Sequence, residues 1–201
     1  MKKAGILGGG QLGRMLLQSA ANYPVLTHVL ENDENCPAAH LCHYFTKGNI
    51  NNFDDVYQFG KNLDCLTIEI ESVNTDALEK LQQEGVKIFP HPEALKTIKN
   101  KILQKQFYAD NQLPSSPFLV TQNKEDLKLH KDFLPAVHKA STDGYDGRGV
   151  QVLHSEDDYE KGFDVPSVLE KMVQVKKEIA IIVAVASNGE TAIYAPVDMV
   201  F

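Results

Sequence analysis

The chain has 201 residues, a length that suits one large domain or two smaller ones. Hydrophobic residues make up 43% and charged residues 23%, a balance that excludes disorder as the main state. Because no apolar run approaches the ~18 residues that a transmembrane helix needs, we expect no membrane span. The net charge of −7 at pH 7 also argues against general nucleic-acid binding, which requires a basic face.

The cysteines and the N-terminal residues indicate the compartment. Three cysteines, Cys36, Cys42 and Cys65, give no disulfide framework and no Cys-x-x-Cys pair for zinc. We expect them to be reduced thiols. The first apolar run, residues 4–7, is interrupted by glycines and followed by Arg14, so no signal peptide is expected. These features predict a cytoplasmic protein.

The first half of the chain predicts alternating strands and helices. Apolar runs predict strands at residues 4–7, 25–30, 64–70 and 86–89. Helical spacing predicts helices over residues 11–21, 53–60 and 74–83. The alternation predicts a parallel sheet with right-handed crossovers. The apolar face expected for the first helix consists of Leu12, Met15, Leu16 and Ala20.

The pattern changes from about residue 98 onward. An amphipathic helix is expected over residues 98–109, and a short helix is expected to begin at Ser155, with Asp158 as a partial capping box. We expect an α/β chain with a Rossmann-like parallel sheet over residues 1–97 and an incomplete α+β domain over residues 98–201, because the chain stops directly after a strand-like run. The β-like runs of this second half are residues 117–121, 135–139, 149–153, 167–171, 178–186 and 191–197.

A glycine-rich turn follows the first predicted strand. Gly8, Gly10 and Gly13 satisfy the pattern G-x-G-x-x-G between that strand and a helix. Such glycines allow a tight turn, and the helix N-terminus offers N–H groups to an anion. With Glu31 near the end of the second strand, the motif alone favours a nicotinamide or flavin cofactor. A turn without a nucleotide and a different phosphorylated ligand stay open as alternatives.

Two carboxylates, Glu69 and Glu71, lie at i and i+2 near the end of the third predicted strand. This spacing places them on one side of the strand. Ligands bind at the carboxyl edge of a parallel sheet, and one face of a buried strand rarely carries two unpaired acids. We expect a functional role for at least one of them, Glu71 before Glu69. The alternative is a solvated strand end.

The most informative stretch is a glycine-rich loop between two predicted strands of the second half. Three glycines within residues 144–149 exceed what a hairpin turn requires and suit a loop that covers a phosphate. Arg148 adds a forked donor for phosphate or carboxylate, and Tyr145 and Asp146 add a phenol and a carboxylate. We expect Lys139, in the preceding strand, to reach the same phosphates. The weaker candidates, whose charges are usually solvated when taken alone, are Lys101, Glu170 and Glu178.

Together these motifs resemble the ATP-grasp superfamily, and more narrowly the N5-carboxyaminoimidazole ribonucleotide synthase family. The matching elements occur in the family's order and extend over the whole chain. The glycine turn and the glycine-rich loop are highly specific in combination, because a dinucleotide dehydrogenase has no reason to carry the second. The matching elements are residues 8–15, residues 67–71 with Val73, Phe89 with Pro90, Lys101, residues 104–106, Lys139, residues 144–149, Glu170 and Glu178.

The resemblance implies a reaction of de novo purine biosynthesis. ATP phosphorylates bicarbonate to carboxyphosphate, and the amine of 5-aminoimidazole ribonucleotide captures the carboxyl group. The products are N5-carboxyaminoimidazole ribonucleotide, ADP and phosphate. Catalysis then consists of positioning, charge stabilisation at the transferred phosphoryl group and exclusion of water. The resemblance further implies Mg²⁺, whose ligands are expected beyond residue 201, and a homodimer for the full-length protein, with no nucleic-acid or membrane partner.

The resemblance also implies roles for individual residues. Backbone groups of residues 170–173 would read adenine, and Glu178 would hold the ribose hydroxyls. The catalytic residues would be Lys139, Asp146 and Arg148. The ATP-binding residues would be Lys101, Lys139, Gly144, Tyr145, Asp146, Gly147, Arg148, Gly149, Val150, Glu170, Lys171, Met172, Val173 and Glu178. The ribonucleotide-binding residues would be Gly10, Gln11, Leu12, Glu71, Tyr145, Asp146 and Arg148.

Three positions depart from the family pattern. Lys101 replaces a frequent arginine, Ser72 a frequent asparagine and Asp143 a frequent glycine. Because the magnesium-binding acids are expected downstream, we expect the 201-residue chain alone to be inactive. The alternatives are another ATP-grasp carboxylate–amine ligase, such as a formate-dependent glycinamide ribonucleotide transformylase or a biotin carboxylase subunit, a dinucleotide-dependent oxidoreductase, and a non-catalytic nucleotide-binding module.

Overall fold

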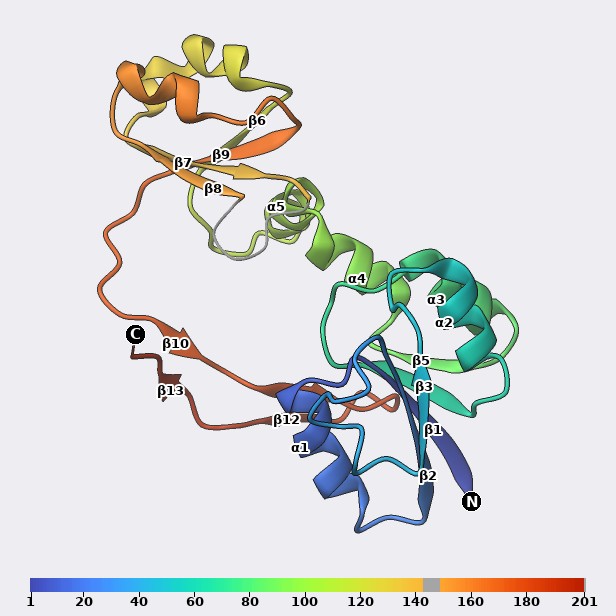
Figure 1. Cartoon of the computed structure of the whole chain (residues 1–201). Coiled ribbons are helices and arrows are strands. Elements are labelled where there is room, and N and C mark those ends of the chain that lie inside the picture. The colour runs from blue at the N-terminus through green and yellow to red at the C-terminus, as the bar shows by residue number, and fades with distance from the viewer. Residues whose placement is uncertain (143–148, 201) are drawn as a thin grey trace.

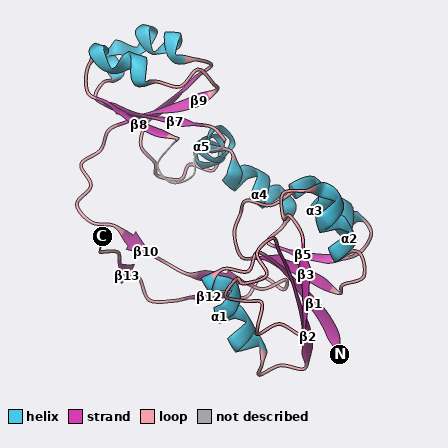
Figure 2. Ribbon diagram, viewed as in Figure 1, coloured by secondary structure: helices cyan, strands magenta, loops and turns pink. Residues whose placement is uncertain are grey.

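The structure, a computed structural model, describes residues 1–142 and 149–200. It contains two bodies, each built around a β-sheet, with helices α4 (Pro92–Lys99) and α5 (Lys101–Asp110) between them (Figure 1). An extended C-terminal arm, residues 173–200, leaves the second body (Figure 2). None of the helices in the described ranges is long and apolar enough to cross a membrane.

The first body contains a five-stranded sheet in the order β3-β2-β1-β4-β5, in which every neighbouring pair is parallel. The predicted α/β class and the predicted parallel sheet are therefore confirmed. The elements are β1 (Lys2–Leu7), α1 (Gln11–Ala20), β2 (Val25–Glu31), β3 (Tyr44–Lys47), α2 (Phe53–Gly60), β4 (Cys65–Ile68), α3 (Thr75–Gln83) and β5 (Lys87–Phe89).

Alternate residues of β1 are buried in two different cores. Leu7 packs with Leu30 and with Leu78 of α3 on one face of the sheet. Ile6 packs with Leu17 of α1 on the other face. Helices therefore cover both faces of the sheet, and polar groups that bind a ligand must lie at the ends of its strands.

Helix α1 does not bury the apolar face that its sequence predicts. Leu12 and Met15 are 62% and 52% exposed, whereas Gly13 and Leu17 are buried. A Cβ atom at Gly13 would lie 3.2 Å from the carbonyl oxygen of Gly8. The close approach of the helix to the glycine turn therefore determines which face points inward, and the apolar stripe remains at the surface.

The helix expected over residues 98–109 is present mainly as α5, and its first two residues belong to α4, a helix that was not predicted and that ends before Asn100. Asn100 has extended backbone angles (φ −118°, ψ 109°), and its side-chain oxygen accepts hydrogen bonds from the N–H groups of Ile102 and Leu103 at 3.0 and 3.1 Å. An asparagine that caps a new helix in this way ends the one before it.

The second body contains a four-stranded antiparallel sheet in the order β6-β9-β7-β8. One face of this sheet packs against the two 3₁₀ helices through Leu127, Tyr159 and Leu169. The predicted short helix after Ser155 is present, and the carboxylate of Asp158 accepts from the Ser155 N–H at 3.3 Å. The elements are β6 (Phe118–Thr121), η1 (Lys124–Phe133), β7 (Ala136–Ala140), β8 (Val150–Leu153), η2 (Glu156–Lys161) and β9 (Ser167–Lys171).

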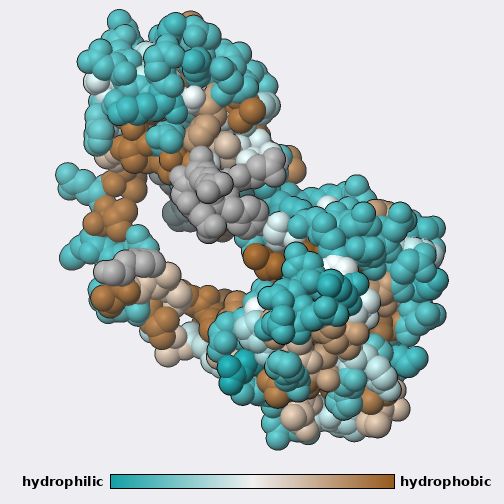
Figure 3. Space-filling model, in the orientation of Figure 1, coloured by the Kyte–Doolittle hydropathy of each residue, from teal (hydrophilic) through white to brown (hydrophobic). Residues whose placement is uncertain are grey.

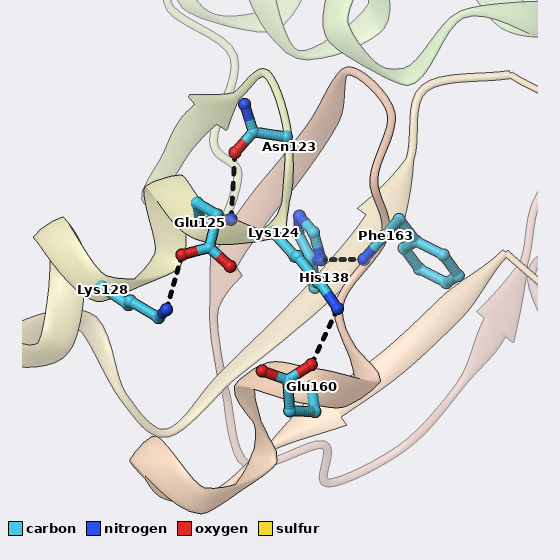
Figure 4. A network of polar contacts seen from close by, with 7 residues as sticks. All are labelled: Asn123, Lys124, Glu125, Lys128, His138, Glu160 and Phe163. Atoms are coloured by element: carbon cyan, nitrogen blue, oxygen red, sulfur yellow. Dashed lines mark hydrogen bonds and ion pairs between the residues drawn. The ribbon is translucent and has the colours of Figure 1, made fainter.

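A fully buried histidine, His138 of β7, lies on the face that the 3₁₀ helices cover (Figure 4). The N–H of Phe163 donates to its Nδ1 at 3.3 Å, so Nε2 carries the proton and donates to Thr121 Oγ1 at 2.9 Å. This imidazole is therefore neutral and its tautomer is fixed by its two partners.

The C-terminal arm carries four short strands that pair as two separate two-stranded ladders, β10 with β13 and β11 with β12. Each of the two runs predicted as one strand, residues 178–186 and 191–197, is split in two. Most of the arm is exposed, although its side chains are largely apolar (Figure 3). The strands are β10 (Ile179–Ala180), β11 (Val183–Val185), β12 (Thr191–Ile193) and β13 (Val197–Asp198).

Candidate functional site

A largely buried carboxylate, Glu170 of β9, is the centre of a charged cluster between α5 and the second sheet. Its Oε1 lies 3.0 Å from Nζ of Lys139 in β7, and its Oε2 lies 3.0 Å from Nζ of Lys105 in α5. The hydroxyl of Ser116 donates to the same Oε2 at 2.8 Å. Lys105 also donates to the hydroxyl oxygens of Ser115 and Ser116, at 2.7 and 3.1 Å. These five residues form one connected polar network.

Strand pairing places these groups on one face of the sheet. Glu170 pairs with Val137 of β7 and with Phe118 of β6. Because side chains alternate between the two faces of a strand, Lys139 shares the face of Val137 and Glu170. His138, which lies between these two positions of β7, is buried on the opposite face. The sheet therefore keeps an uncharged core on one side and presents its charges to α5 on the other.

The cluster keeps Glu170 ionised although its side chain is only 12% exposed. Burial is the largest single influence on its pKa and acts to raise it. The hydrogen bonds from Lys105, Lys139 and Ser116 act in the opposite direction and together outweigh burial, so the pKa of Glu170 lies below its ordinary value. The carboxylate is a fixed negative charge that pairs with two ammonium groups, so the cluster keeps one net positive charge.

Lys101 lies next to the strand that leads into the glycine-rich loop. Its backbone N–H donates to the carbonyl oxygen of Ser141 at 2.8 Å, directly after β7. On the far side of the loop, the carbonyl oxygen of Gly149 accepts from the N–H of Ala140 at 3.0 Å. The loop residues that we expect to cover a phosphate, including Gly144, Tyr145, Asp146, Gly147 and Arg148, lie outside the described residues.

The residues expected to read adenine follow Glu170 in the chain. The Nζ of Lys171 donates to the carbonyl oxygens of Phe133 and Leu134 at 3.0 and 2.9 Å, on the face opposite the cluster. The N–H of Met172 donates to a backbone carbonyl, and Val173 is exposed. No described side-chain contact joins Glu178 to the cluster. It is exposed, immediately precedes β10, and accepts through its backbone carbonyl from Met199 at 3.1 Å.

The glycine turn of the first body is closed by two acids. The N–H of Gly9 donates to Glu31 Oε2 at 3.1 Å, and the N–H of Leu12 donates to Glu69 Oε1 at 3.3 Å. A Cβ atom at Gly10 would lie 2.6 Å from Glu69 Oε1, so a larger residue at this position would displace the carboxylate. Both acids therefore have a structural role in the turn.

The acids near the turn differ in how they are engaged. Glu31 also accepts from the N–H of Asn32 at 2.7 Å, so each of its two carboxylate oxygens holds a backbone N–H group. Glu71, by contrast, is exposed, with only its backbone carbonyl engaged, by the N–H of Val73 at 2.8 Å. Of the predicted acid pair, Glu71 therefore stays the candidate for ligand binding, together with the exposed Gln11.

Sequence reasoning did not identify Lys105, Ser115 and Ser116 as members of the site. Lys105 is 6% exposed, although it lies in a helix whose other lysine, Lys101, is more accessible. The useful signal was the pair of hydroxyl residues between two prolines, a short polar segment directly before β6. A lysine and two serines in this arrangement provide the partners that a buried carboxylate requires.

Comparison with known proteins agrees with the resemblance of the motifs. The family model of the ribonucleotide synthetase preATP-grasp domain matches residues 1–99 of the sequence. The family model of the ATP-grasp domain matches residues 106–200. Phosphoribosylaminoimidazole carboxylase, chloroplastic, of Vigna aconitifolia is 35% identical over 204 residues, which cover 97% of this chain and 36% of that protein. The chain thus spans about a third of this relative.

Solved structures give the same result. N5-carboxyaminoimidazole ribonucleotide synthetase from Thermotoga maritima superposes with a TM-score of 0.90 at 31% identity, over 99% of this chain and 54% of that one. The Aspergillus clavatus N5-carboxyaminoimidazole synthase, solved with ADP and 5-aminoimidazole ribonucleotide, gives a TM-score of 0.86 at 33% identity over 100% of this chain and 54% of that one. The two domain matches and these likenesses show that the chain belongs to the ATP-grasp family, with a ribonucleotide synthetase preATP-grasp domain at its N-terminal end.

Proposed function

We propose that this chain supplies the ribonucleotide-binding and phosphate-binding parts of an ATP-dependent carbon–nitrogen ligase. The reaction is the carboxylation of 5-aminoimidazole ribonucleotide with bicarbonate. The observation that carries the proposal is the position of Lys139, whose partly exposed Nζ is held by Glu170 on the strand that leads into the glycine-rich loop. The likeness to a structure solved with ADP and 5-aminoimidazole ribonucleotide supports the same assignment.

The reaction has two steps. A bicarbonate oxygen attacks the terminal phosphorus of ATP, the bond to ADP breaks, and carboxyphosphate forms. The carboxyl group then passes to the amine nitrogen of the ribonucleotide, which loses a proton, while phosphate leaves. Such phosphoryl transfer depends mainly on positioning and on cations around the transferred group.

The residues of this chain have separate parts in the proposal. Lys139 and Lys101 contact the ATP phosphates, and Asp146 and Arg148 are the further catalytic residues that the resemblance implies. Backbone groups of residues 170–173 bind adenine, and Glu178 binds the ribose. Gly10, Gln11, Leu12 and Glu71 bind the ribonucleotide in the first body. The cytoplasmic location and the homodimer belong to the same proposal.

Magnesium enters this proposal only as a cofactor of the whole enzyme. The described residues hold no group of three His, Cys, Asp or Glu side chains that would bind a metal ion. When bound beside ATP, Mg²⁺ neutralises phosphate charge. The described residues do not fit such a site.

Binding of ATP to the 201-residue chain tests the phosphate site. We expect Lys139→Ala to weaken ATP binding by on the order of tenfold or more, because it removes a charged hydrogen bond to phosphate. Lys47→Ala is the matched control, since Lys47 is an exposed lysine that pairs with Glu34 at 3.0 Å. Isothermal titration calorimetry measures both. Equal loss in the two variants, or no ATP binding by the unsubstituted chain, would contradict the proposal.

Phosphate release by the product of the complete reading frame tests the reaction. We expect release from ATP and bicarbonate to depend on 5-aminoimidazole ribonucleotide. Release that depends on a different acceptor would identify another ATP-grasp carboxylate–amine ligase. A parallel fluorescence titration with NADH, for which we expect no binding, tests the oxidoreductase alternative.

A further inference from the structure

We propose that Lys105 is a positioning residue for ATP binding: with Ser116 it holds the Glu170 carboxylate in place, so that Glu170 can release Lys139 to a phosphate group. The inference rests on the proposed function, because it takes Lys139 as a phosphate ligand. It assigns a role to the one buried lysine of α5, which the proposed reaction does not otherwise use.

The contacts of Lys105 leave it no donor for a ligand. An ammonium group has three N–H bonds. The Nζ of Lys105 has three oxygen acceptors, on Ser115, Ser116 and Glu170, at 2.7, 3.1 and 3.0 Å. Its side chain is 8% exposed, and the ring of Phe118 lies 5.9 Å from Nζ. Lys105 therefore acts on Glu170 and not on a bound molecule.

Lys139 has the opposite properties. Its side chain is 30% exposed, and Glu170 is the one acceptor that the described residues provide for its Nζ. A phosphate that approaches Lys139 therefore competes with one described acceptor, the carboxylate of Glu170. The two lysines that share Glu170 therefore differ in their contacts. Each N–H bond of the Lys105 ammonium group has an acceptor in the protein, whereas Lys139 is able to exchange Glu170 for a phosphate.

The two oxygens of Glu170 divide its partners in the same way. Oε1 pairs with Lys139, whereas Oε2 is held by both Lys105 and Ser116. When Lys139 turns to a phosphate, Oε2 keeps its two donors, and the carboxylate is not left as an unpaired buried charge. An unpaired buried charge is strongly destabilising, so the contacts at Oε2 lower the cost of the exchange.

Loss of Lys105 is therefore expected to couple ATP binding to pH. The charged groups that face Glu170 in the described structure are Lys105 from α5 and Lys139 from β7, while Ser116 and the ring of Phe118 do not titrate. Without Lys105, burial raises the pKa of Glu170, and release of Lys139 requires Glu170 to take up a proton. In the unsubstituted chain Glu170 stays ionised through neutral pH, so no such coupling is expected.

The experiment compares ATP affinity at two pH values for the unsubstituted chain and for Lys105→Met. At about pH 8 we expect Lys105→Met to bind ATP on the order of tenfold more weakly, and at about pH 6 the ratio of the two dissociation constants should fall toward one. The double variant Lys105→Met/Glu170→Gln should bind ATP more tightly than Lys105→Met at pH 8. Its neutral glutamine does not become an unpaired buried charge when Lys139 moves to a phosphate. A lysine with a purely structural role would show neither the pH-dependent ratio nor this rescue.

Lys96→Met is the matched control, since Lys96 lies on α4 and pairs with Asp76 and Glu79 at the surface. Effects of Lys105→Met equal to those of Lys96→Met at both pH values would overturn this inference but leave the proposed function intact. Failure of the unsubstituted chain to bind ATP would contradict the proposed function itself. If circular dichroism shows that Lys105→Met is unfolded, Ser116→Ala, which removes one donor to the same Oε2, should give a smaller effect of the same pH dependence, and no effect would overturn the inference.

Discussion

His138 is fully buried in the second body and is neutral in the fold. Burial lowers its pKa from the ordinary value of 6.5 to about 4. As the pH falls, the unfolded chain therefore takes up this proton first. The stability that neutral His138 contributes is complete above about pH 6.5 and is lost as the pH falls toward 4, by up to about 3 kcal/mol. Urea unfolding measured across this range should show the loss.

The variant His138→Gln separates this effect from other titrations. A glutamine amide is able to donate to Thr121 and accept from the N–H of Phe163, but it does not titrate. Between about pH 6.5 and 4, we expect the unsubstituted chain to lose more stability than the variant. An NMR titration that places the pKa of His138 near 6.5 would contradict the prediction, whether or not the variant folds.

At the scale of elements, α5 depends on its cap at Asn100. Asn100→Ala removes the acceptor for the N–H groups of Ile102 and Leu103, and we expect a loss of about 1 kcal/mol in unfolding free energy. Because α5 carries Lys101 and Lys105, the same change should weaken ATP binding. Chemical denaturation and calorimetry on the same samples measure both quantities, and Asn100→Asp should restore most of each.

The N-cap of α3 offers a control with the same residue type, although the Asn74 side chain also donates to the carbonyl oxygen of Asn51 at 3.2 Å. The side chain of Asn74 accepts from the N–H of Ala77 at 2.9 Å, and α3 holds none of the residues of the charged cluster. Asn74→Ala should therefore cost a similar free energy of unfolding while ATP affinity stays unchanged. If Asn74→Ala and Asn100→Ala reduce ATP affinity equally, the cap of α5 has no specific link to the site.

Hydrophobic periodicity predicted the helices that pack on both faces of the first sheet. It predicted the wrong buried face for α1, where the close approach of Gly13 to the glycine turn determines the packing. Ala77, Leu78 and Leu81 of α3 are buried, because the apolar spacing of this predicted helix is also its packing surface. The break at Asn100 is invisible to periodicity, since the helical pattern continues on both sides of the cap. The edge strand β3 was not predicted, because its residues are mostly exposed and form no apolar run.

At the scale of the whole molecule, the charged cluster illustrates what a sequence pattern leaves out. The sequence singled out Lys139 beside the glycine-rich loop, and the family resemblance added Glu170, each as a separate ligand-binding residue. It did not predict that they pair with each other, or that Lys105 joins them from a helix before the sheet. Those contacts follow from the register of β9 against β6 and β7 and from the packing of α5, which no local pattern encodes.

The C-terminal arm is the part of the molecule with the least packing. Its strands form two separate two-stranded ladders, and isolated ladders of this kind are marginally stable in water. The three hydrophobic clusters of the described residues contain none of the arm. We expect backbone amides of residues 173–200 to exchange with deuterium at least ~100-fold faster than those of β7 and β9.

Hydrogen exchange followed by mass spectrometry measures this difference, with peptides of β7 and β9 as the internal reference. The exposed apolar side chains of the arm, among them Ile182, Val185 and Ile193, would gain protection if a second copy of the chain covered them. The experiment is therefore done at two protein concentrations. Slow exchange of the arm at both concentrations would contradict the prediction, because it requires packing that the described structure does not contain. Protection that appears only at the higher concentration would instead identify the arm as a surface of self-association.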